Sequence, residues 1–482
     1  MDQNVEPVGI IYGDVSINSF MVLFKKEVKK GSYLKINIDG IGEILCYLDN
    51  VVRRSDLSKK AAAKLMNGIP VEITDMLEGF VSIIGYIKND KFQFPAVTAR
   101  SGTEVYYADE DLIRNVLKLN NAGKGYAYIG MLENQPIKVN IDINQLLNKH
   151  FSVIAKTGAG KSYFVAVILE ELLKNNVTTV VIDPHDEYRT FTEESEYIPA
   201  MKEFEMVPLS FRSKINIFGI DKSINSQYNQ LTFTLRRSDI DFLLSTAGLS
   251  AERYHELFNN GFSKEIPPYN LDKIMSHLRA EEDEKGKKIV ENISMHKYRN
   301  LFVENGTPIT SLIKEGELSV ISLAGADPVI QEYAVNRICT ELYEAVKAKK
   351  LPSLALIIEE AHNFVPQTGG NALSSSILKT IASEGRKFGV GLGIITQRPA
   401  KIDKNVLSQC GTQITLQVTS SIDLKVIGSS MEGYTDGLEK TIQNLEIGKA
   451  LISGYAVRFP LVMRIRPRHT KHGGDAIPVI KW

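Results

Sequence analysis

A short loop of small residues constrains this chain more than any other feature of its sequence. Residues 151–155 form an apolar run of strand character, and residues 157–160 read Thr-Gly-Ala-Gly. From Lys161 onward, apolar side chains recur at the spacing of a helix. In a strand, small-residue loop and helix, backbone N–H groups can turn inward around phosphate oxygens, and the helix N-terminus adds further donors. The sequence therefore predicts a phosphate-binding loop here.

Each part of this loop has an expected role with a nucleoside triphosphate such as ATP. We expect the ammonium group of Lys161 to reach the β- and γ-phosphates and the hydroxyl of Ser162 to bind Mg²⁺. The pattern usually opens with glycine, whereas this chain has Ala155. The alternative is a tight strand–helix turn that binds nothing. The predicted nucleotide-binding residues of the loop are Thr157, Gly158, Ala159, Gly160, Lys161, Ser162 and Tyr163.

Length and composition limit the class of protein. A chain of 482 residues is too long for one hydrophobic core and predicts two or three domains. Lys plus Arg and Asp plus Glu both total 57, so any surface for nucleic acid has to be local. The three cysteines match neither a disulfide framework nor a zinc site. Because the sequence shows neither a signal peptide nor an apolar run of about 20 residues, we expect a soluble, cytoplasmic protein.

The pattern of elements changes along the chain. Residues 1–100 contain short β-rich runs separated by Gly and Asp turns, which predicts a small barrel interrupted by one helix. Residues 101–221 and 316–482 alternate strands with helices, which predicts an α/β core and a C-terminal tail. Residues 222–315 are mainly helical, and we interpret them as an insertion into that core.

A second strand of the predicted core ends in a polar motif. The β-branched run 177–182 is followed by Asp-Pro-His-Asp-Glu-Tyr at 183–188. In a doubly wound parallel sheet, ligands bind at the carboxyl ends of the strands. Asp183 and Glu187 can therefore orient water or a metal ion, although helix capping and simple surface exposure are alternatives.

A third apolar run, 354–358, ends in two adjacent carboxylates, which is typical of the second half of a P-loop ATPase. We expect Glu359 to hold Mg²⁺, directly or through water, and Glu360 to polarise the attacking water as general base. Aspartate is more common at the first position. The alternative is that these acids only begin a helix, where negative charge is favoured anyway.

A further strand ends just before Gln397, which would lie beside Glu360 and could sense the γ-phosphate. We predict that Arg386 acts in trans on the nucleotide of a neighbouring subunit, because arginine fingers of this kind stabilise the transition state. Arg398 is better placed to act in cis. The alternative for Arg386 is an ordinary surface pair with Glu384.

Taken together, these motifs resemble the HerA family, hexameric DNA-translocating ATPases of the FtsK/HerA superfamily, over almost the full length of the chain. The motifs that carry the resemblance are 150–151, 157–162, 183–188, 359–363, 384–389, 396–399 and 472–474. The resemblance implies an N-terminal HAS-barrel and a RecA-like core that hydrolyses ATP at subunit interfaces. The departures from the family pattern are Ala155, Glu359 and Asp186, where many members have glycine.

The resemblance also implies nucleotide contacts outside the loop. In the family, a basic residue just ahead of the first core strand lies near bound nucleotide, and here that residue is Lys149. The family's C-terminal tail reaches toward nucleotide in a neighbour, which implicates Lys471 and His472. All three could instead be ordinary surface residues.

The implied assembly is a homohexamer with double-stranded DNA through its pore. The implied partner is a NurA-like nuclease in DNA end resection, or a nuclease or NAD-consuming effector in defence against phage. A second hypothesis is a scaffold in which ATP binding organises a ring that assembles an effector. A third is a conjugation-type pump at a membrane, against which the lack of a membrane segment counts.

Overall fold

The computed structural model describes residues 6–221, 223, 226–280, 283–294, 301–367, 372–431 and 436–473. The chain divides into two compact units. The first consists of Met1–Asp142 and Met431–Arg466, and the second of Ile143–Ser430 and Pro467–Trp482. Residues 101–142 and a C-terminal hairpin therefore belong with the N-terminal strands, which differs from the boundary expected near residue 100.

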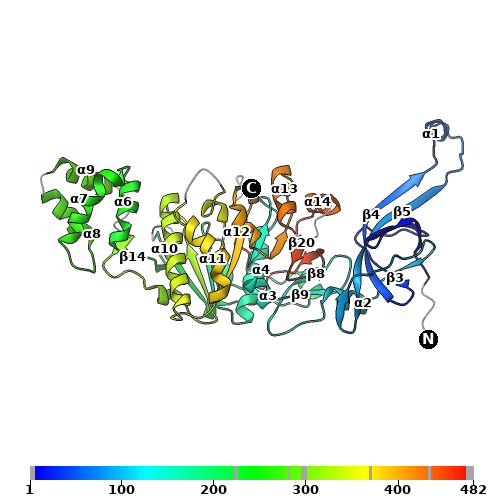
Figure 1. Ribbon diagram of the computed structural model, residues 1–482, viewed down its shortest axis with the longest axis horizontal. Helices are drawn as coiled ribbons and strands as arrows, with labels where there is room; N and C mark the ends of the chain where they lie inside the picture. The colour runs from blue at the N-terminus through cyan, green and yellow to red at the C-terminus, as the bar shows by residue number, and fades with distance from the viewer. Residues whose placement is uncertain are drawn as a thin grey trace. The chain divides into compact units, whose positions relative to one another are not determined.

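Six strands of the first unit close into the expected small barrel, drawn in blue in Figure 1. Their order is β2-β1-β7-β3-β4-β5, and β5 pairs again with β2, so that the barrel has no open edge. Alternate side chains point inward and form an apolar core that includes Phe20, Leu34 and Val81. The strands are β1 (Gly9–Val15), β2 (Ser19–Phe24), β3 (Tyr33–Ile38), β4 (Gly42–Ser55), β5 (Asp75–Lys88) and β7 (Glu104–Tyr107).

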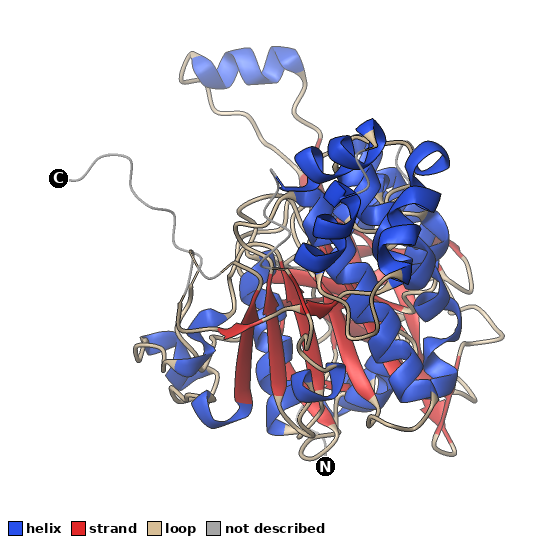
Figure 2. Cartoon of the chain, turned by 90° about the vertical axis from the view of Figure 1, so that its left-hand side faces the viewer, coloured by secondary structure: helices blue, strands red, loops and turns tan. Residues whose placement is uncertain are grey.

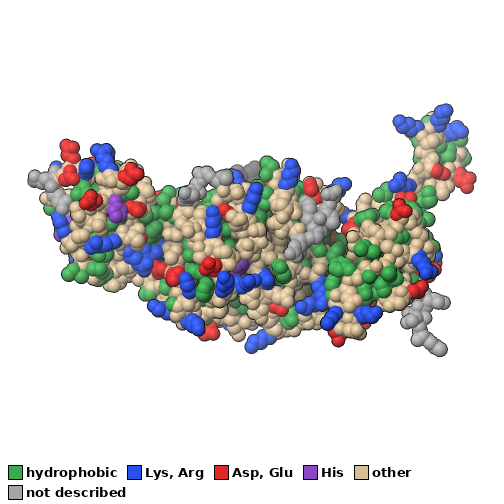
Figure 3. All heavy atoms as spheres, viewed as in Figure 1, with side chains coloured by type: hydrophobic (Ala, Val, Ile, Leu, Met, Phe, Trp, Pro, Cys, Tyr) green, Lys and Arg blue, Asp and Glu red, His purple; other side chains and the backbone are tan. Residues whose placement is uncertain are grey.

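A helical arm interrupts the barrel where the sequence predicts a helix. Helix α1 (Lys59–Met66) connects the ends of β4 and β5 and is capped by Ser58, whose hydroxyl accepts a hydrogen bond from the N–H of Ala61. None of its residues is buried, and its three lysines face solvent near the end of the arm (Figure 3).

A smaller antiparallel sheet completes the first unit. Its strands are β8 (Tyr126–Leu132), β9 (Lys138–Asp142), β20 (Lys449–Gly454) and β21 (Leu461–Ile465), in the order β20-β21-β8-β9. Besides α1, the described residues of this unit form two further α-helices, α2 (Glu110–Leu117) and α14 (Asp436–Gln443).

Eight parallel strands form the sheet of the second unit, in the order β13-β12-β16-β11-β17-β18-β10-β19. The two strands at one edge of this order are β12 (Ile215–Gly219) and β13 (Asn229–Gln230). The central strands are buried along their whole length, because helices cover both faces (Figure 2). This is the expected P-loop ATPase core. The central strands are β10 (Phe151–Ile154), β11 (Thr179–Asp183), β16 (Leu318–Ser322), β17 (Leu354–Ile358), β18 (Val390–Thr396) and β19 (Thr412–Thr415). The covering helices include α4 (Lys161–Lys174), α10 (Pro328–Lys347) and α11 (Ser375–Phe388).

In the described part of the segment expected to be a helical insertion, four α-helices lie along the chain between two short paired strands. The strands are β14 (Phe233–Thr234) and β15 (Phe302–Val303), and the helices are α6 (Ile240–Thr246), α7 (Ala251–Ser263), α8 (Leu271–Ala280) and α9 (Glu284–Ser294). At the base of the insertion, Arg337 and Tyr333 of α10 both donate to Asp239, each at 2.9 Å. This buried network ties the insertion to the core.

In the described part of the chain, no helix combines the length and apolar character needed to cross a membrane.

Candidate active site

The strand order of the second unit brings the predicted motifs to one edge of the sheet. Strands β10, β18, β17 and β11 are neighbours in that order and run parallel, so their carboxyl ends meet. The phosphate loop follows β10, Gln397 follows β18, Glu359 and Glu360 follow β17, and Asp183 ends β11.

The phosphate loop has the backbone conformation that its glycines permit. Gly158 and Gly160 have φ values of 76° and 92°, in the left-handed region that other residues enter only with strain. Gly160 is the N-cap of α4 and Lys161 is the first residue of that helix. The loop therefore leads directly into a helix N-terminus, whose first N–H groups have no partner within the helix.

Lys161 is held between two carboxylates. Its ammonium nitrogen lies 2.6 Å from Oε2 of Glu359 and 2.7 Å from Oε1 of Glu360. All three side chains are buried. Burial by itself would lower the pKa of Lys161, but the two carboxylates outweigh it and raise that pKa. Burial raises the pKa of Glu359. Burial is also the largest single influence on Glu360, but Lys161, His362 and Gln397 together outweigh it and lower that pKa. A triphosphate can replace the carboxylates as the counter-ion of Lys161.

Gln397 links the phosphate loop to Glu360. Its Nε2 donates to Oε1 of Glu360 at 2.7 Å, and its Oε1 accepts a hydrogen bond from the hydroxyl of Thr157. This bridge forms because β18 lies between β10 and β17 in the sheet. Glu360 itself has a φ of 48°, a strained conformation for a residue with a side chain, which sets the direction of its carboxylate.

Two residues to which the sequence analysis gave no role belong to the same cluster. The hydroxyl of Tyr188 donates to Oε1 of Glu359. The Nδ1 atom of His362 lies 3.3 Å from Oε2 of Glu360 and 3.2 Å from the hydroxyl of Thr396. Both residues occur in loops that follow core strands. Their position after the strands is the sequence feature that could have predicted a place at the carboxyl edge of the sheet.

Asp183 shapes the loop that carries Tyr188. Its two carboxylate oxygens accept hydrogen bonds from the N–H groups of His185, at 3.2 Å, and Tyr188, at 3.1 Å. The side chain is buried, and burial raises its pKa to about 7 against the opposing hydrogen bonds from the backbone. Asp183 thus organises the loop, while Glu187 is only partly buried.

The donor set at this edge fits the Mg²⁺ that accompanies ATP. The hydroxyl of Ser162 and the carboxylate of Glu359 are hard oxygen donors, and Mg²⁺ in such sites takes its other ligands from phosphates and water. Within the described ranges, no group of three or more His, Cys, Asp and Glu side chains is arranged to hold a metal by itself. The chain therefore suits a metal shared with the nucleotide.

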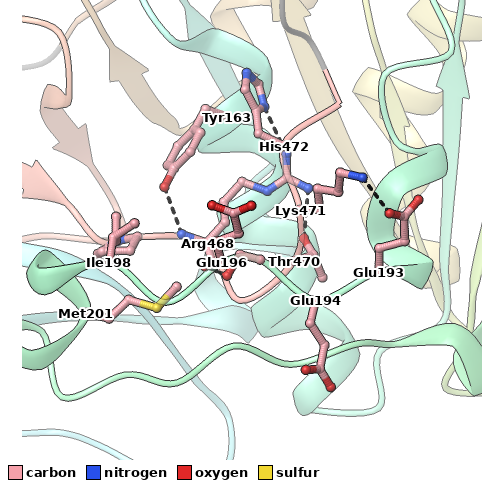
Figure 4. A pocket seen from close by; sticks show the side chains of 12 residues that line it. Tyr163, Glu193, Glu194, Glu196, Ile198, Met201, Arg468, Thr470, Lys471 and His472 are labelled. Carbon is pink, nitrogen blue, oxygen red and sulfur yellow. Dashed lines mark hydrogen bonds and ion pairs between the residues drawn. The ribbon is translucent and has the colours of Figure 1, made fainter.

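A pocket of about 490 Å³ opens beside the first turn of α4 (Figure 4). We call residues 467–472, which form one of its walls, the C-terminal strap. Tyr163, Lys471 and His472, all predicted to contact nucleotide, line this one pocket, and the rings of Tyr163 and His472 are 5.5 Å apart. The other lining residues are Glu193, Glu194, Ser195, Glu196, Ile198, Met201, Pro467, Arg468 and Thr470.

The strap is attached to the same helix that begins at the phosphate loop. Glu170 of α4 is fully buried and accepts hydrogen bonds from the N–H of His469 (3.1 Å) and from the N–H (2.9 Å) and hydroxyl (2.7 Å) of Thr470. The N–H of Arg468 donates to the hydroxyl of Tyr163 at 2.9 Å. His472 therefore lies against α4 of its own chain, while the ammonium group of Lys471 donates to Glu193 at 2.7 Å. Gly474, the last residue of the C-terminal motif, is outside the described residues.

Two of the predicted cations lie away from this edge. Arg386 is in the last turn of α11, ahead of the seven-residue β18, and Lys149 precedes the four-residue β10, so both are at the amino-terminal edge of the sheet. A four-residue strand spans about 13 Å, so each lies about that far or farther from the phosphate loop. Arg386 is exposed, and no acidic side chain of the described residues lies within ion-pair distance of it. The alternative pair with Glu384 is not formed; Glu384 instead accepts a hydrogen bond from Tyr343 at 3.3 Å. Arg398 directly follows Gln397 at the nucleotide edge.

Two family models match the chain. The model described as "Helicase HerA, central domain" matches residues 127–342, and "Helicase HerA-like C-terminal" matches residues 333–459. Together they include the phosphate loop, both carboxylates and Gln397.

Similar proteins match over nearly their whole length. The chain is 27% identical to the DNA double-strand break repair helicase HerA of Saccharolobus solfataricus, covering 95% of this chain and 92% of that protein. It is also 27% identical to the protein of the same name from Pyrococcus furiosus, covering 99% and 97%. Among solved structures, VirB4 of Thermoanaerobacter pseudethanolicus matches with a TM-score of 0.50 and 13% identity, covering 72% of this chain and 97% of VirB4, which shows a shared fold.

Proposed function

This chain belongs to the HerA helicase family and is an ATPase, and from that premise we propose that it works as a homohexameric ring that moves along double-stranded DNA. The observation that carries the proposal is the cluster of Lys161, Glu359, Glu360 and Gln397 at one edge of the sheet. These are the groups that bind a γ-phosphate and activate the water that attacks it.

The hydrolysis step follows from the geometry of these groups. Lys161 exchanges its carboxylate partners for the β- and γ-phosphates of ATP. Glu360 takes a proton from water as the water oxygen attacks the γ-phosphorus, and the bond to the β–γ bridging oxygen breaks. Gln397, which bridges Thr157 and Glu360, senses whether the γ-phosphate is present. When bound, Mg²⁺ neutralises phosphate charge, and Ser162 and Glu359 are the residues that would hold it.

The position of Arg386 supports a ring. Arg386 is exposed at the sheet edge opposite to the phosphate loop of its own chain, which favours a role at the nucleotide of a neighbouring subunit over one at its own. Lys149 lies at the same edge and would face the same neighbour. Sites that need a cation from the next subunit are complete only in a closed assembly, because every interface then has both halves.

The pocket beside α4 is suited to the nucleoside end of ATP. It begins at Tyr163, directly after Ser162, and its volume is within the range of small-molecule sites. The Tyr163 and His472 rings can contact a base, and the adjoining carboxylates can accept hydrogen bonds from its amino group. We therefore assign Lys471 and His472 to the nucleotide of their own subunit.

The biological setting that we propose is DNA end resection with a nuclease, or anti-phage defence with a nuclease or another effector. The alternative is a scaffold in which ATP binding organises the ring and no processive movement occurs. The motor is supported by the two similar proteins named above, which are DNA double-strand break repair helicases.

The test is ATP-dependent displacement of streptavidin from biotinylated duplex DNA. We expect the native ring to displace it. Lys161→Ala should lose nucleotide turnover, since it removes the point charge expected against the β- and γ-phosphates, and Glu360→Gln should bind ATP without hydrolysing it. Hydrolysis without displacement would favour the scaffold. Turnover at the native rate by Lys161→Ala would contradict the assignment of the site.

A further inference from the structure

We propose that each of the two adjacent carboxylates has its own positioning residue, Tyr188 for Glu359 and His362 for Glu360. This rests on the proposed function, which puts Glu359 on the metal side and Glu360 on the water side of the γ-phosphate. It adds two residues that act through the carboxylates without touching the nucleotide.

The need for such residues follows from how Lys161 is shared. One ammonium group pairs with both carboxylates, at 2.6 and 2.7 Å. When Lys161 turns to the phosphates, two buried like charges that are adjacent in the chain lose their common counter-ion and repel each other. The two carboxylates must point in different directions because they have different roles. Each therefore needs its own hydrogen-bond donor to hold it in place.

Tyr188 is such a donor for Glu359. Its hydroxyl donates to Oε1, while Lys161 contacts Oε2, so the two partners do not compete for the same oxygen. The Tyr188 side chain is fully buried, packs edge-on against Phe191 with ring centroids 6.0 Å apart, and its N–H is held by Asp183. Because the ring and the backbone of Tyr188 are held in this way, its hydroxyl has a fixed position and keeps the Glu359 carboxylate in one orientation.

His362 has the corresponding place beside Glu360. Oε1 of Glu360 already accepts from Lys161 and Gln397, whereas Oε2 is buried and accepts no hydrogen bond of good geometry from the described part of the chain. His362 Nδ1 lies 3.3 Å from that oxygen, and Thr396, whose hydroxyl accepts from the N–H of Arg398 at 3.0 Å, holds the imidazole from the side. We assign the proton to Nδ1, which lies close enough to Oε2 to donate to it when Lys161 turns to the phosphates.

The first arm of the test measures binding, not turnover. Tyr188→Phe removes only the hydroxyl. We expect the Mg²⁺ concentration that half-saturates tight binding of a fluorescent ATP analogue to rise on the order of tenfold, while binding in EDTA stays as in the native ring. Tyr343→Phe is the matched control, since it removes a buried tyrosine's hydroxyl that contacts Glu384 away from the cluster. Equal losses with and without Mg²⁺ would mean a merely structural role and would overturn the assignment to Glu359.

The second arm compares two amides at position 362. The amide nitrogen of asparagine can occupy the place of Nδ1, whereas that of glutamine reaches the place of Nε2. We expect His362→Gln to lower kcat about tenfold or more with KM and Mg²⁺ dependence unchanged, and His362→Asn to restore most of the rate. If both variants lose the same rate, or neither loses any, the assignment to Glu360 is wrong.

Glu359→Gln and Glu360→Gln separate this inference from the proposed function. If Glu360→Gln hydrolyses ATP normally, or Glu359→Gln binds Mg-ATP normally, the roles of the carboxylates themselves fail. If both lose function as expected while the Tyr188 and His362 variants behave like the native ring, only the positioning residues are refuted.

Discussion

At the scale of single residues, Asp183 is a buried carboxylate that the hydrolysis step does not use. Both of its carboxylate oxygens accept hydrogen bonds, from the N–H groups of His185 and Tyr188, and these bonds stabilise the loop that carries the Tyr188 hydroxyl. Its charge is costly, because burial raises its pKa to about 7 from a reference near 3.9 in an unfolded chain. Ionisation of this buried group at neutral pH therefore lowers the free energy of unfolding, while its hydrogen bonds fix the loop geometry.

That cost predicts a pH dependence with a definite sign. Between about pH 4 and pH 7 the folded protein keeps a proton on Asp183 that the unfolded chain has lost, so stability from this group falls as pH rises. Asp183→Asn cannot ionise. We expect the native protein to lose stability relative to Asp183→Asn between pH 5 and pH 8, on the order of 2 kcal/mol. Denaturant unfolding at both pH values measures this, and parallel profiles for the two proteins would contradict it.

At the scale of elements, helix α4 joins three parts of the site. It begins with Lys161 and Ser162 at the phosphates, presents Tyr163 to the pocket, and seven residues later presents Glu170 to the strap. Positions seven apart lie on the same helical face, so the strap runs along the face that carries Tyr163. Glu170 is therefore one of the groups that hold the strap against the pocket, together with the hydrogen bonds that the strap makes to residues 190–195.

We predict that Glu170→Gln weakens ATP binding and leaves binding of inorganic tripolyphosphate unchanged. The amide presents an N–H₂ group to N–H donors, so the strap loses hydrogen bonds at His469 or Thr470 while the phosphate loop is untouched. The expected loss is about tenfold in Kd for ATP, measured by calorimetry.

Glu171→Gln is the matched control for the strap. Glu171 is the next residue of α4, is also buried, and pairs with Lys174 of the same helix. It should leave both affinities unchanged. If Glu170→Gln weakens the binding of ATP and of tripolyphosphate to the same extent, the strap supports the phosphate loop and not the nucleoside pocket.

At the scale of the whole molecule, the chain provides two halves of a site on opposite edges of one sheet. The carboxyl edge has the phosphate loop and the carboxylates, and the amino edge has the exposed Arg386. The formal net charge is zero, and on the face in Figure 3 basic and acidic side chains both occur in each unit. Association of copies through these edges is therefore not opposed by a large net charge.

Mixed assemblies test whether Arg386 acts in trans. Arg386→Ala subunits keep Lys161, and Lys161→Ala subunits keep Arg386, so a mixed ring contains some interfaces with both residues. We expect mixed rings to hydrolyse ATP faster than either variant alone, since an arginine finger contributes about 10³ to 10⁵ in rate. The check is co-assembly at several ratios, with ring size measured by light scattering. If no ratio exceeds the single variants although rings form, Arg386 does not act in trans.

The phosphate loop, the carboxylate pair and the position of Gln397 after a strand could be predicted from the sequence alone. Each depends on a few consecutive residues whose local conformation follows from glycine content, apolar spacing and strand length. The barrel, the parallel core and the helical insertion could be predicted for the same reason, because periodicity reports which face of each element is buried.

Only the tertiary structure decided how these motifs meet. The strand order places β18 between β10 and β17, which lets Gln397 bridge Thr157 and Glu360. The fold also brings Thr470 to Glu170, which lies 300 residues earlier in the chain. The Tyr188–Glu359 and His362–Glu360 contacts likewise depend on which side chains face one another at the sheet edge. Local periodicity shows which side of an element is buried, but the neighbour it is buried against depends on chain topology, and that is set by the packing of the whole core.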